Sequence, residues 1–338
     1  MWGPNHLVGS SRIFSRILKG VCTMASHGLG KEQSIQQLIA KSRNKKGKKI
    51  IEKVMPIILV ITALISVLTT IGIVFTLIFE TFEFFQRVSI TDYLFGKEWL
   101  PFSGSEPLYG VLPLILGTLK VSVIAACVAV PLGIAAAIYL SEYATDKTRR
   151  TIKPILEVLA GVPTIVYGFF ALTFVTPILQ ELMPSLKIFN ALSPGIVVGI
   201  MILPMIASLS EDAMSSVPNS IREGALALGA TKLEVSLKVV LPAALSGIIA
   251  SVVLAVSRAI GETMIVSLAG GATPTFDFNV TGSIQTMTAY IVQVSSGDAG
   301  YGTTIYYSIY AVGFTLFIFT LIMNLLAQYI SKRFREEY

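Results

Sequence analysis

Charged side chains, cysteines and histidines are scarce in this chain of 338 residues. Asp, Glu, Lys and Arg make up 14% of the chain, against roughly 25% in soluble domains, whereas hydrophobic residues make up 53%. We expect no disulfide, because Cys22 precedes the first apolar run and Cys127 lies inside one. His6 and His27 form no metal-ligand pattern, so no metal site is expected. The composition predicts an all-α integral membrane protein.

A phosphate-binding loop for ATP is also missing. Gly30-Lys31 is followed by Glu32, and Ala25 stands where the first glycine of such a loop would be. We find no nucleophile–base pair and no metal set that would suit a membrane-embedded enzyme. No aromatic and basic motif for nucleic acid accompanies the net charge of +6. We therefore expect no catalytic residues, no bound cofactor and no nucleic-acid partner, and any ATP must be used by partner subunits.

Six apolar runs are long enough for transmembrane helices, which need about 17–25 residues. They cover approximately residues 55–79, 111–140, 154–180, 194–210, 243–269 and 304–331. The first run is uniformly apolar and predicts a peripheral helix facing lipid. The second is rich in glycine and alanine, which favours close packing inside a bundle. Lys120 within it is expected to snorkel or pair, or else to contribute to an anion path.

The third run contains a predicted helix break. Pro163 removes a backbone donor and should kink or open the helix close to Tyr167 and Gly168. Broken helices at membrane depth tend to line cavities or to be buried in protein. A gate and a purely structural kink both remain open at this point.

Basic residues are concentrated in alternate connections between the runs. Seventeen lysines and arginines lie in the flank 41–53, the second and fourth connections and the C-terminal tail, and three lie on the other side. The positive-inside rule then places both termini in the cytoplasm, with a multi-pass chain in the cell membrane touching anionic lipids. The predicted organisation is a basic tail (1–53), a first helix with an external loop (54–110), a transmembrane core (111–331) and a short cytoplasmic tail (332–338).

The N-terminal region has more than one interpretation. Residues 1–31 carry basic residues and serines but no acidic residue up to Lys31, as transit peptides do. We favour a disordered tail, a loosely membrane-bound amphipathic segment or a true start at Met24. Residues 1–53 lack the apolar core of a signal peptide.

The connection 211–242 contains two short, polar predicted helices. Ser220 with Glu223 and Thr231 with Glu234 have capping-box spacing. Gly229 is placed where a turn needs left-handed geometry, and Pro242 marks the end of the second helix. The pattern predicts a surface element offered to another protein, although an ordinary helix–turn–helix between spans would share it.

Arg258 and Glu262 are charged residues near the middle of the fifth apolar run. A charge near the bilayer centre costs roughly 2.5–3.5 kcal/mol even on insertion scales, so such residues usually mark a pathway. Their spacing of four predicts one helical face, flanked by Ser257 and Thr263. They form either an ion pair that fastens helices or a switchable site in which the guanidinium binds an oxyanion and Glu262 accepts a hydrogen bond from a protonated oxyanion such as phosphate.

Four segments together resemble a known family. The first consists of Glu223-Gly224-Ala225, Gly229 and Leu241-Pro242, and it keeps the spacing of the Glu-Ala-Ala loop of ABC-importer permeases. The other three are residues 159–168 (LAGVPTIVYG), 210–214 (SEDAM) and 259–264 (AIGETM). Over residues 54–338 the chain resembles PstC-type permease subunits of phosphate-specific ABC transporters. The resemblance implies a MetI-like type I importer permease fold with six transmembrane helices.

The resemblance also implies partners and site residues. The partners are a second, PstA-like permease, two ATP-binding subunits and an external phosphate-binding protein. The residues expected to couple to the ATPases are Arg222, Glu223, Gly224, Ala225, Gly229, Leu241 and Pro242. The expected substrate pathway is Ser257, Arg258, Glu262 and Thr263, with Pro163, Tyr167 and Gly168 as a gate. A permease for sulfate or molybdate, a secondary anion transporter and an A-type phosphate permease are the alternatives.

Overall fold

The computed structural model describes residues 46–104, 106–297 and 299–333, which are almost entirely helical. The interpretations of residues 1–45 and 334–338 fall outside the described part of the chain. Two compact units are distinguished, Met1–Ile73 and Val74–Tyr338. Within the described residues, five helices are long and apolar enough to cross a membrane, and a bent helix pair supplies a sixth. The prediction of an all-α membrane protein with six spans is confirmed.

Helix α2 (Lys46–Phe85) contains the first candidate span, Glu52–Phe85. Three of its threonines bond within the helix, since Thr62, Thr69 and Thr70 each donate to the carbonyl four residues earlier at 2.8–3.0 Å. Hydroxyl groups satisfied in this way suit a lipid environment, because hydrocarbon offers no hydrogen-bond partners.

A small aromatic module follows α2 and begins the second unit's compact part. It consists of α3 (Ile90–Phe95) and the antiparallel strands β1 (Trp99–Leu100) and β2 (Leu108–Tyr109). Phe84, Tyr93, Trp99, Tyr109 and Tyr290 are buried together and meet edge to face. Such aromatic pairs contribute about 0.5–1.5 kcal/mol beyond burial. The loop between the first two spans therefore has a packed structure of its own.

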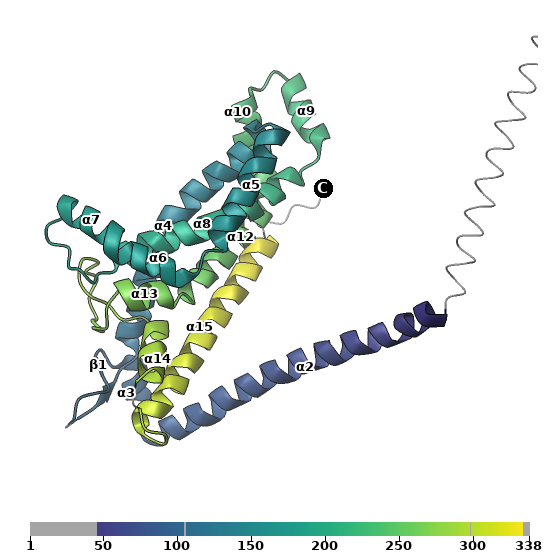
Figure 1. The fold of residues 1–338 in the computed structure, drawn as a ribbon. Helices are drawn as coiled ribbons and strands as arrows, with labels where there is room; N and C mark the ends of the chain where they lie inside the picture. Colours follow the sequence, from purple (N-terminus) through teal and green to yellow (C-terminus); the bar gives the residue numbers. More distant parts are fainter. Residues whose placement is uncertain (1–45, 105, 298, 334–338) are drawn as a thin grey trace, which may run out of the picture. The chain divides into compact units, whose positions relative to one another are not determined.

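The core of the second unit is a helical bundle built on α4 (Leu112–Ile138) and α8 (Leu192–Ser215) (Figure 1). Glycines let the two backbones approach. A Cβ at Gly133 would lie 2.8 Å from Ile206 Cγ2, and one at Gly199 would lie 2.9 Å from the Ala125 carbonyl oxygen. The predicted close packing of the second span is confirmed. Lys120 of α4 is buried and pairs with Asp277 at 2.9 Å, so the expectation of pairing holds.

The third predicted span begins later than expected. Residues 146–160 form the separate helix α5 (Asp146–Ala160), with Pro154 in its interior and strongly amphipathic character. The span itself starts after a break, and its parts are α6 (Thr164–Phe170), the π-helical turn η2 (Ala171–Val175) and α7 (Thr176–Leu182). The correction has a physical reason, because the basic residues between Lys147 and Lys153 keep one face of α5 out of an apolar phase.

The next two helices also differ from expectation at their ends. The fourth apolar run is expected to end near residue 210, but α8 contains Pro204 in its interior and continues to Ser215. The fifth apolar run is interrupted, with α12 (Leu245–Ile260) stopping before Gly261 and α13 (Met264–Ala269) following. The chain then forms α14 (Met287–Ser295) and the long α15 (Thr304–Arg333).

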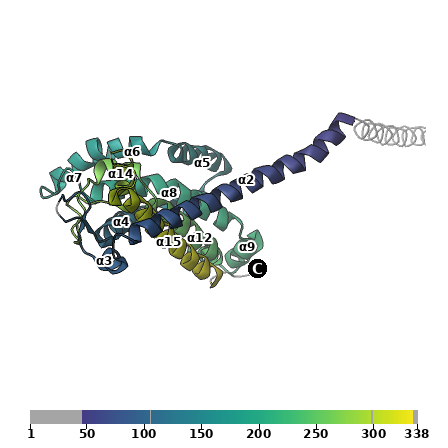
Figure 2. The ribbon, with the colours of Figure 1, turned by 90° about the horizontal axis from the view of Figure 1, so that it is seen from below.

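The connection between the fourth and fifth spans extends from one end of this unit. It comprises α9 (Asn219–Ala227), α10 (Lys232–Val235), the π-helical turn η3 (Ser236–Val240) and α11 (Leu241–Ala243). In Figure 1, α9 and α10 lie at the opposite end of the second unit from β1 and α3, and Figure 2 shows α4, α8 and α12 grouped between them. The π-helical turn η1 (Tyr139–Tyr143) extends α4 towards this end.

Candidate functional site

The α9–α10 connection has one of its two predicted capping boxes. The Thr231 hydroxyl accepts from the Glu234 amide at 3.3 Å, and Glu234 accepts in return from the Thr231 amide at 3.0 Å. The bonds that the Thr231 amide and hydroxyl donate to the Glu234 carboxylate, together with Lys238, lower the pKa of Glu234. Gly229 has φ of 87°, as expected for the turn. The Ser220 box is not formed, because α9 begins one residue earlier at Asn219, and Ser220 lies inside the first turn instead of preceding it.

Pro242 lies just before the end of the second helical segment. Because proline lacks an N–H, the preceding turn rearranges into η3, and the Leu241 amide donates to the Ser236 carbonyl, five residues back. The helix stops after Ala243, and α12 continues at a bend of 72°. Pro242 therefore marks the end of the second helical segment as predicted, and the last helical residue is Ala243, one position later.

The tip of the connection is exposed and partly apolar. Leu228 is 90% exposed, and Leu226 and Leu233 are also exposed. Glu223 and Gly224 of the motif face solvent as well. An exposed apolar tip on a short two-helix element is suited to insertion into a partner's cleft.

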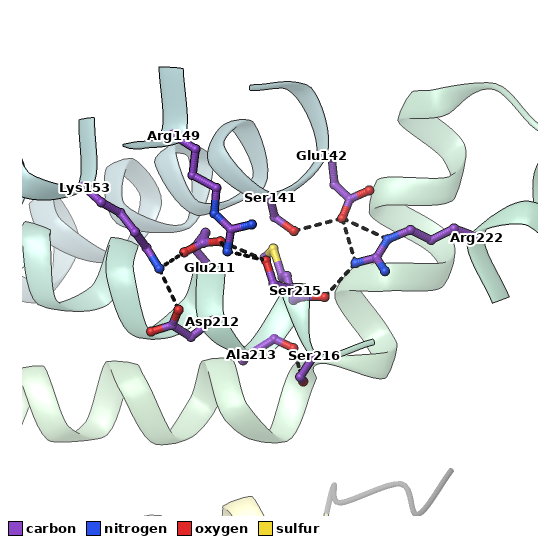
Figure 3. Close-up of polar contacts among 11 residues, drawn as sticks. Ser141, Glu142, Arg149, Lys153, Glu211, Asp212, Ala213, Ser215, Ser216 and Arg222 are labelled. Carbon is purple, nitrogen blue, oxygen red and sulfur yellow. Dashed lines mark hydrogen bonds and ion pairs between the residues drawn. The ribbon is translucent and has the colours of Figure 1, made fainter. Parts of the chain in front are cut away.

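Arg222, in contrast, is turned into the protein. Its guanidinium donates to Glu142 Oε1 from Nε at 3.3 Å and from Nη2 at 3.1 Å. It also donates to the carbonyls of Met214 at 2.7 Å and Val217 at 2.5 Å, and to Asn219 Oδ1 at 3.2 Å. Figure 3 shows Arg222 facing Glu142 across the gap between α9 and the end of α4.

A second charged cluster lies beside the first (Figure 3). Glu211 of α8 is fully buried and pairs with Arg149 and Lys153 of α5. Lys153 also donates to Asp212 Oδ1 at 2.6 Å, and Ser215 donates to Glu211 at 2.8 Å. Desolvation lowers the pKa of Lys153, but the bonds to Asp212 and Glu211 outweigh it and raise the pKa overall. Sequence reasoning named Glu211 only within a motif, although adjacent carboxylates opposite a basic amphipathic helix were a usable signal.

Two helix breaks meet on the other side of the bundle. The helix is interrupted at residues 161–163, where Pro163 predicted a break, and Pro163 itself is the N-cap of α6. Gly168 lets α6 lie against α13, since a Cβ there would be 3.2 Å from the Met264 carbonyl oxygen. Tyr167 is buried and donates to the Leu159 carbonyl at 2.8 Å. The fold thus brings Gly168 of the predicted gate against the start of α13, directly after the predicted pathway residues Glu262 and Thr263.

Arg258 and Glu262 do not share a helical face. Helix α12 ends at Ile260, so the four-residue rule for a continuous helix fails. Glu262 Oε1 instead accepts from the amides of Met264 at 3.1 Å and Ile265 at 3.3 Å, at the start of α13. Ionised carboxylates are favoured at helix N-termini. The Arg258–Glu262 ion pair, one of the two interpretations drawn from the sequence, is not formed among the described residues.

This geometry leaves Arg258 exposed at the end of α12. Among the described residues its guanidinium makes no hydrogen bond or ion pair. The Ser257 hydroxyl links α12 to α15, because it donates to Asn324 Oδ1 at 2.7 Å. Thr263 donates to the Gly261 carbonyl at 3.2 Å and stands at the N-cap of α13. Chemically, the break between α12 and α13 is preceded by a forked cation without a hydrogen bond and contains a buried carboxylate whose Oε2 has no hydrogen bond to the described residues.

Known proteins resemble this chain in sequence and fold. The family described as "Binding-protein-dependent transport system inner membrane component" matches residues 129–336. The chain is 37% identical over 249 residues to the probable ABC transporter permease protein YqgH of Bacillus subtilis, covering 73% of this chain and 79% of that protein. It is 32% identical over 262 residues to the phosphate transport system permease protein PstC of Xylella fastidiosa, covering 72% and 79%. It is 34% identical over 246 residues to PstC 1 of Mycobacterium tuberculosis, covering 67% and 73%.

A solved structure shares the fold. A chain of a bacterial alginate ABC transporter, in complex with an alginate-bound periplasmic protein, superposes with a TM-score of 0.55 at 18% identity. The match covers 81% of this chain and 95% of the solved one. At this identity the likeness concerns the fold alone.

Proposed function

Because the chain belongs to the family of binding-protein-dependent transport system inner membrane components, we propose that it is the permease subunit that carries inorganic phosphate in an ATP-driven importer. The family makes it a multi-pass ABC importer permease with the type I fold. The observation that carries the phosphate proposal is Arg258, a forked cation free of hydrogen bonds within the described residues, at the end of a helix four residues before the buried carboxylate of Glu262. Relatives named as phosphate permeases support it.

The proposed binding chemistry has two parts. The guanidinium of Arg258 donates paired hydrogen bonds to a tetrahedral oxyanion. Glu262 keeps the hydrogen bonds of Oε1 to the start of α13 and accepts a hydrogen bond from the hydroxyl of a hydrogen phosphate through Oε2. A fully deprotonated sulfate has no such proton, so this carboxylate disfavours sulfate by charge repulsion. Thr263 and Tyr167 line the same junction of helix breaks.

The energy for transport comes from partners. We propose a complex with a second, PstA-like permease, two ATP-binding subunits and an external phosphate-binding protein. The exposed tip of the α9–α10 connection docks into an ATP-binding subunit, with Glu223, Gly224, Ala225 and Gly229 shaping it and Leu241-Pro242 setting the bend into α12. Both termini then face the cytoplasm. The chain itself carries no catalytic function, and ATP is hydrolysed by the ATP-binding subunits.

The proposal is tested by uptake of radiolabelled phosphate into proteoliposomes holding the complete transporter. Arg258→Lys keeps the charge but loses the fork, and Glu262→Gln keeps the Oε1 bonds to α13 but loses the charge. We expect each variant to fold and to lower uptake about tenfold or more, the scale of one lost charge-assisted hydrogen bond. Lys147→Gln, on the exposed face of α5, is the matched charge control and should transport normally. Wild-type uptake by both site variants would refute the assignment.

Competition separates the alternatives. Excess sulfate or molybdate should leave phosphate uptake unchanged, whereas arsenate, a protonated tetrahedral oxyanion, should compete. Inhibition by sulfate would indicate a permease for another oxyanion, which the printed name of YqgH leaves open. Uptake without ATP or ATP-binding subunits would indicate a secondary transporter.

A further inference from the structure

Arg222 makes as many hydrogen bonds as a guanidinium can donate. The group has five N–H donors, and the five bonds to Glu142, Met214, Val217 and Asn219 use them all. Arg222 immediately precedes Glu223 in the motif, yet direct contact with a partner would break one of these bonds. Arg222 therefore holds α9 in place within this chain and is not available to bind a partner.

Of the two carbonyls that Arg222 binds, that of Met214 belongs to the last turn of α8 and that of Val217 to the short link that follows the helix. Helix α8 ends at Ser215, and the last carbonyls of a helix have no partner within it. Arg222 supplies donors to Met214 and Val217 and places a cation at this helix C-terminus, where the helix dipole favours it. The covalent link from α8 to α9 is only residues 216–218, so the side chain forms a second, shorter connection across it.

Glu142 provides the third anchor. It belongs to η1 at the end of α4, its side chain is only 6% exposed, and Ser141 also donates to it at 2.9 Å. The adjacent Glu211 cluster ties α5 to α8 in the same region through Arg149 and Lys153 (Figure 3). The ends of α4, α5, α8 and α9 are thus joined by charged contacts at one end of the bundle.

We propose that Glu142 is a positioning residue which, through Arg222, makes α9 move as one body with the ends of α4 and α8. Displacement of α9 by a partner then moves the transmembrane helices instead of being absorbed by bending at residues 216–218. The inference rests on the proposed function in one respect, namely that the α9–α10 connection is where an ATP-binding subunit acts.

The first test measures the amount of phosphate taken up per ATP hydrolysed by the reconstituted transporter. In Glu142→Gln the amide keeps the shape of the side chain but loses the charge that holds Arg222. We expect ATP hydrolysis within about twofold of wild type and uptake lowered about tenfold, as for a lost hydrogen bond between charged groups. Arg222→Lys, which keeps the charge without the fork, should shift the ratio in the same direction.

Lys238→Gln is the matched control. Lys238 pairs with Glu234 at 3.3 Å in the same connection, but the pair is exposed and lies within one helical segment. Exposed pairs of this kind contribute little, so the control should keep the wild-type ratio. A wild-type ratio in Glu142→Gln would overturn the inference, and so would failure of that variant to co-purify with the ATP-binding subunits, which would indicate a docking role.

The second test does not depend on the transported ion. Spin labels at the exposed positions Leu228 and Val123, in a chain with Cys22 and Cys127 replaced by serine, report the distance between the tip of the connection and α4. We expect one narrow distance distribution in wild type with and without ATP, and a broadened or ATP-dependent one in Glu142→Gln. An ATP-dependent distance in wild type would show that α9 moves alone. Lack of phosphate uptake by the wild-type transporter would refute only the proposed substrate.

Discussion

Glu211 illustrates how much one side chain contributes to this fold. The carboxylate is fully buried, and its charge is balanced by Arg149 and Lys153, which are themselves partly exposed. A buried charge is tolerated only when it is paired and hydrogen-bonded. The apolar pattern of the fourth run does not require a carboxylate here, and only the approach of α5 explains it.

Replacing Glu211 by glutamine should be strongly destabilising. Two cations would lose their common counter-charge, and breaking a buried pair from one side typically costs about 3–5 kcal/mol. We expect a clear fall in the thermal unfolding temperature of the detergent-purified chain, measured by scanning fluorimetry. Asp212→Asn is the control, because its side chain is 58% exposed and such surface pairs are worth about 0–1 kcal/mol. Equal shifts in the two variants would contradict the interpretation of Glu211.

Two glycines of the α9–α10 connection should respond to alanine in opposite directions. Gly224 lies in α9 with open space around its Cβ position, so Gly224→Ala should stabilise the helix by up to about 1 kcal/mol. Gly229 also has open space, but its φ of 87° strains any other residue. We expect slower amide hydrogen exchange in residues 222–228 for the first variant and faster exchange for the second. If exchange changed in the same direction in both variants, helix propensity at Gly224 and backbone strain at Gly229 would not be the dominant effects.

At the scale of elements, local chemistry predicted some boundaries and missed others. The Thr231–Glu234 box formed because both side chains act within one turn. The Ser220 box failed because Val217-Pro218 directs the chain into α9 one residue early. The break before α6 follows from Pro163, whereas the break after α12 depends on Glu262, whose charge caps α13 and stops the four-residue pairing with Arg258. A carboxylate can cap or pair, and only its neighbours decide which.

The pair Lys120–Asp277 joins α4 to the segment before α14 and has a defined pH dependence. The hydrogen bond from Lys120 lowers the pKa of Asp277 below its usual 3.8. The stabilisation is therefore fully present above the ordinary aspartate pKa and is lost as the pH falls through the lower, folded value. Between about pH 5 and 8 the contribution should be constant.

Asp277→Asn tests this linkage. The buried Lys120 would keep only the Asn279 carbonyl, at 3.1 Å, so we expect a loss of about 1–3 kcal/mol. The difference in unfolding temperature from wild type, measured by scanning fluorimetry, should not change between about pH 5 and 8. Glu181→Gln, an exposed carboxylate without a pair among the described residues, serves as the control. A difference that disappears above pH 5 would contradict the lowered pKa.

At the scale of the whole molecule, orientation links the exposed tip to the proposed partners. Leu228→Cys, in a chain without other cysteines, puts a thiol at the 90% exposed position of the connection. We expect membrane-impermeant maleimide to label it in inside-out vesicles and not in intact cells, because the basic connections stay cytoplasmic. Adding the ATP-binding subunits should protect the thiol. Labelling from outside intact cells would reverse the topology and remove the basis for coupling.

The amino-acid sequence by itself determined the class of this protein, because apolar runs, alternating basic connections and the spacing Glu223–Gly229–Pro242 are properties of contiguous residues. It also marked Arg258, Glu262 and Pro163 as unusual. Only the tertiary structure decided which groups meet: Glu211 with α5, Lys120 with Asp277, and Arg222 with Glu142. These partners lie far apart in the chain, and charge alone does not choose among the cations and carboxylates available to it. The packing of the helices determines which charges pair, because an unpaired charge is costly wherever the helices leave no water to solvate it.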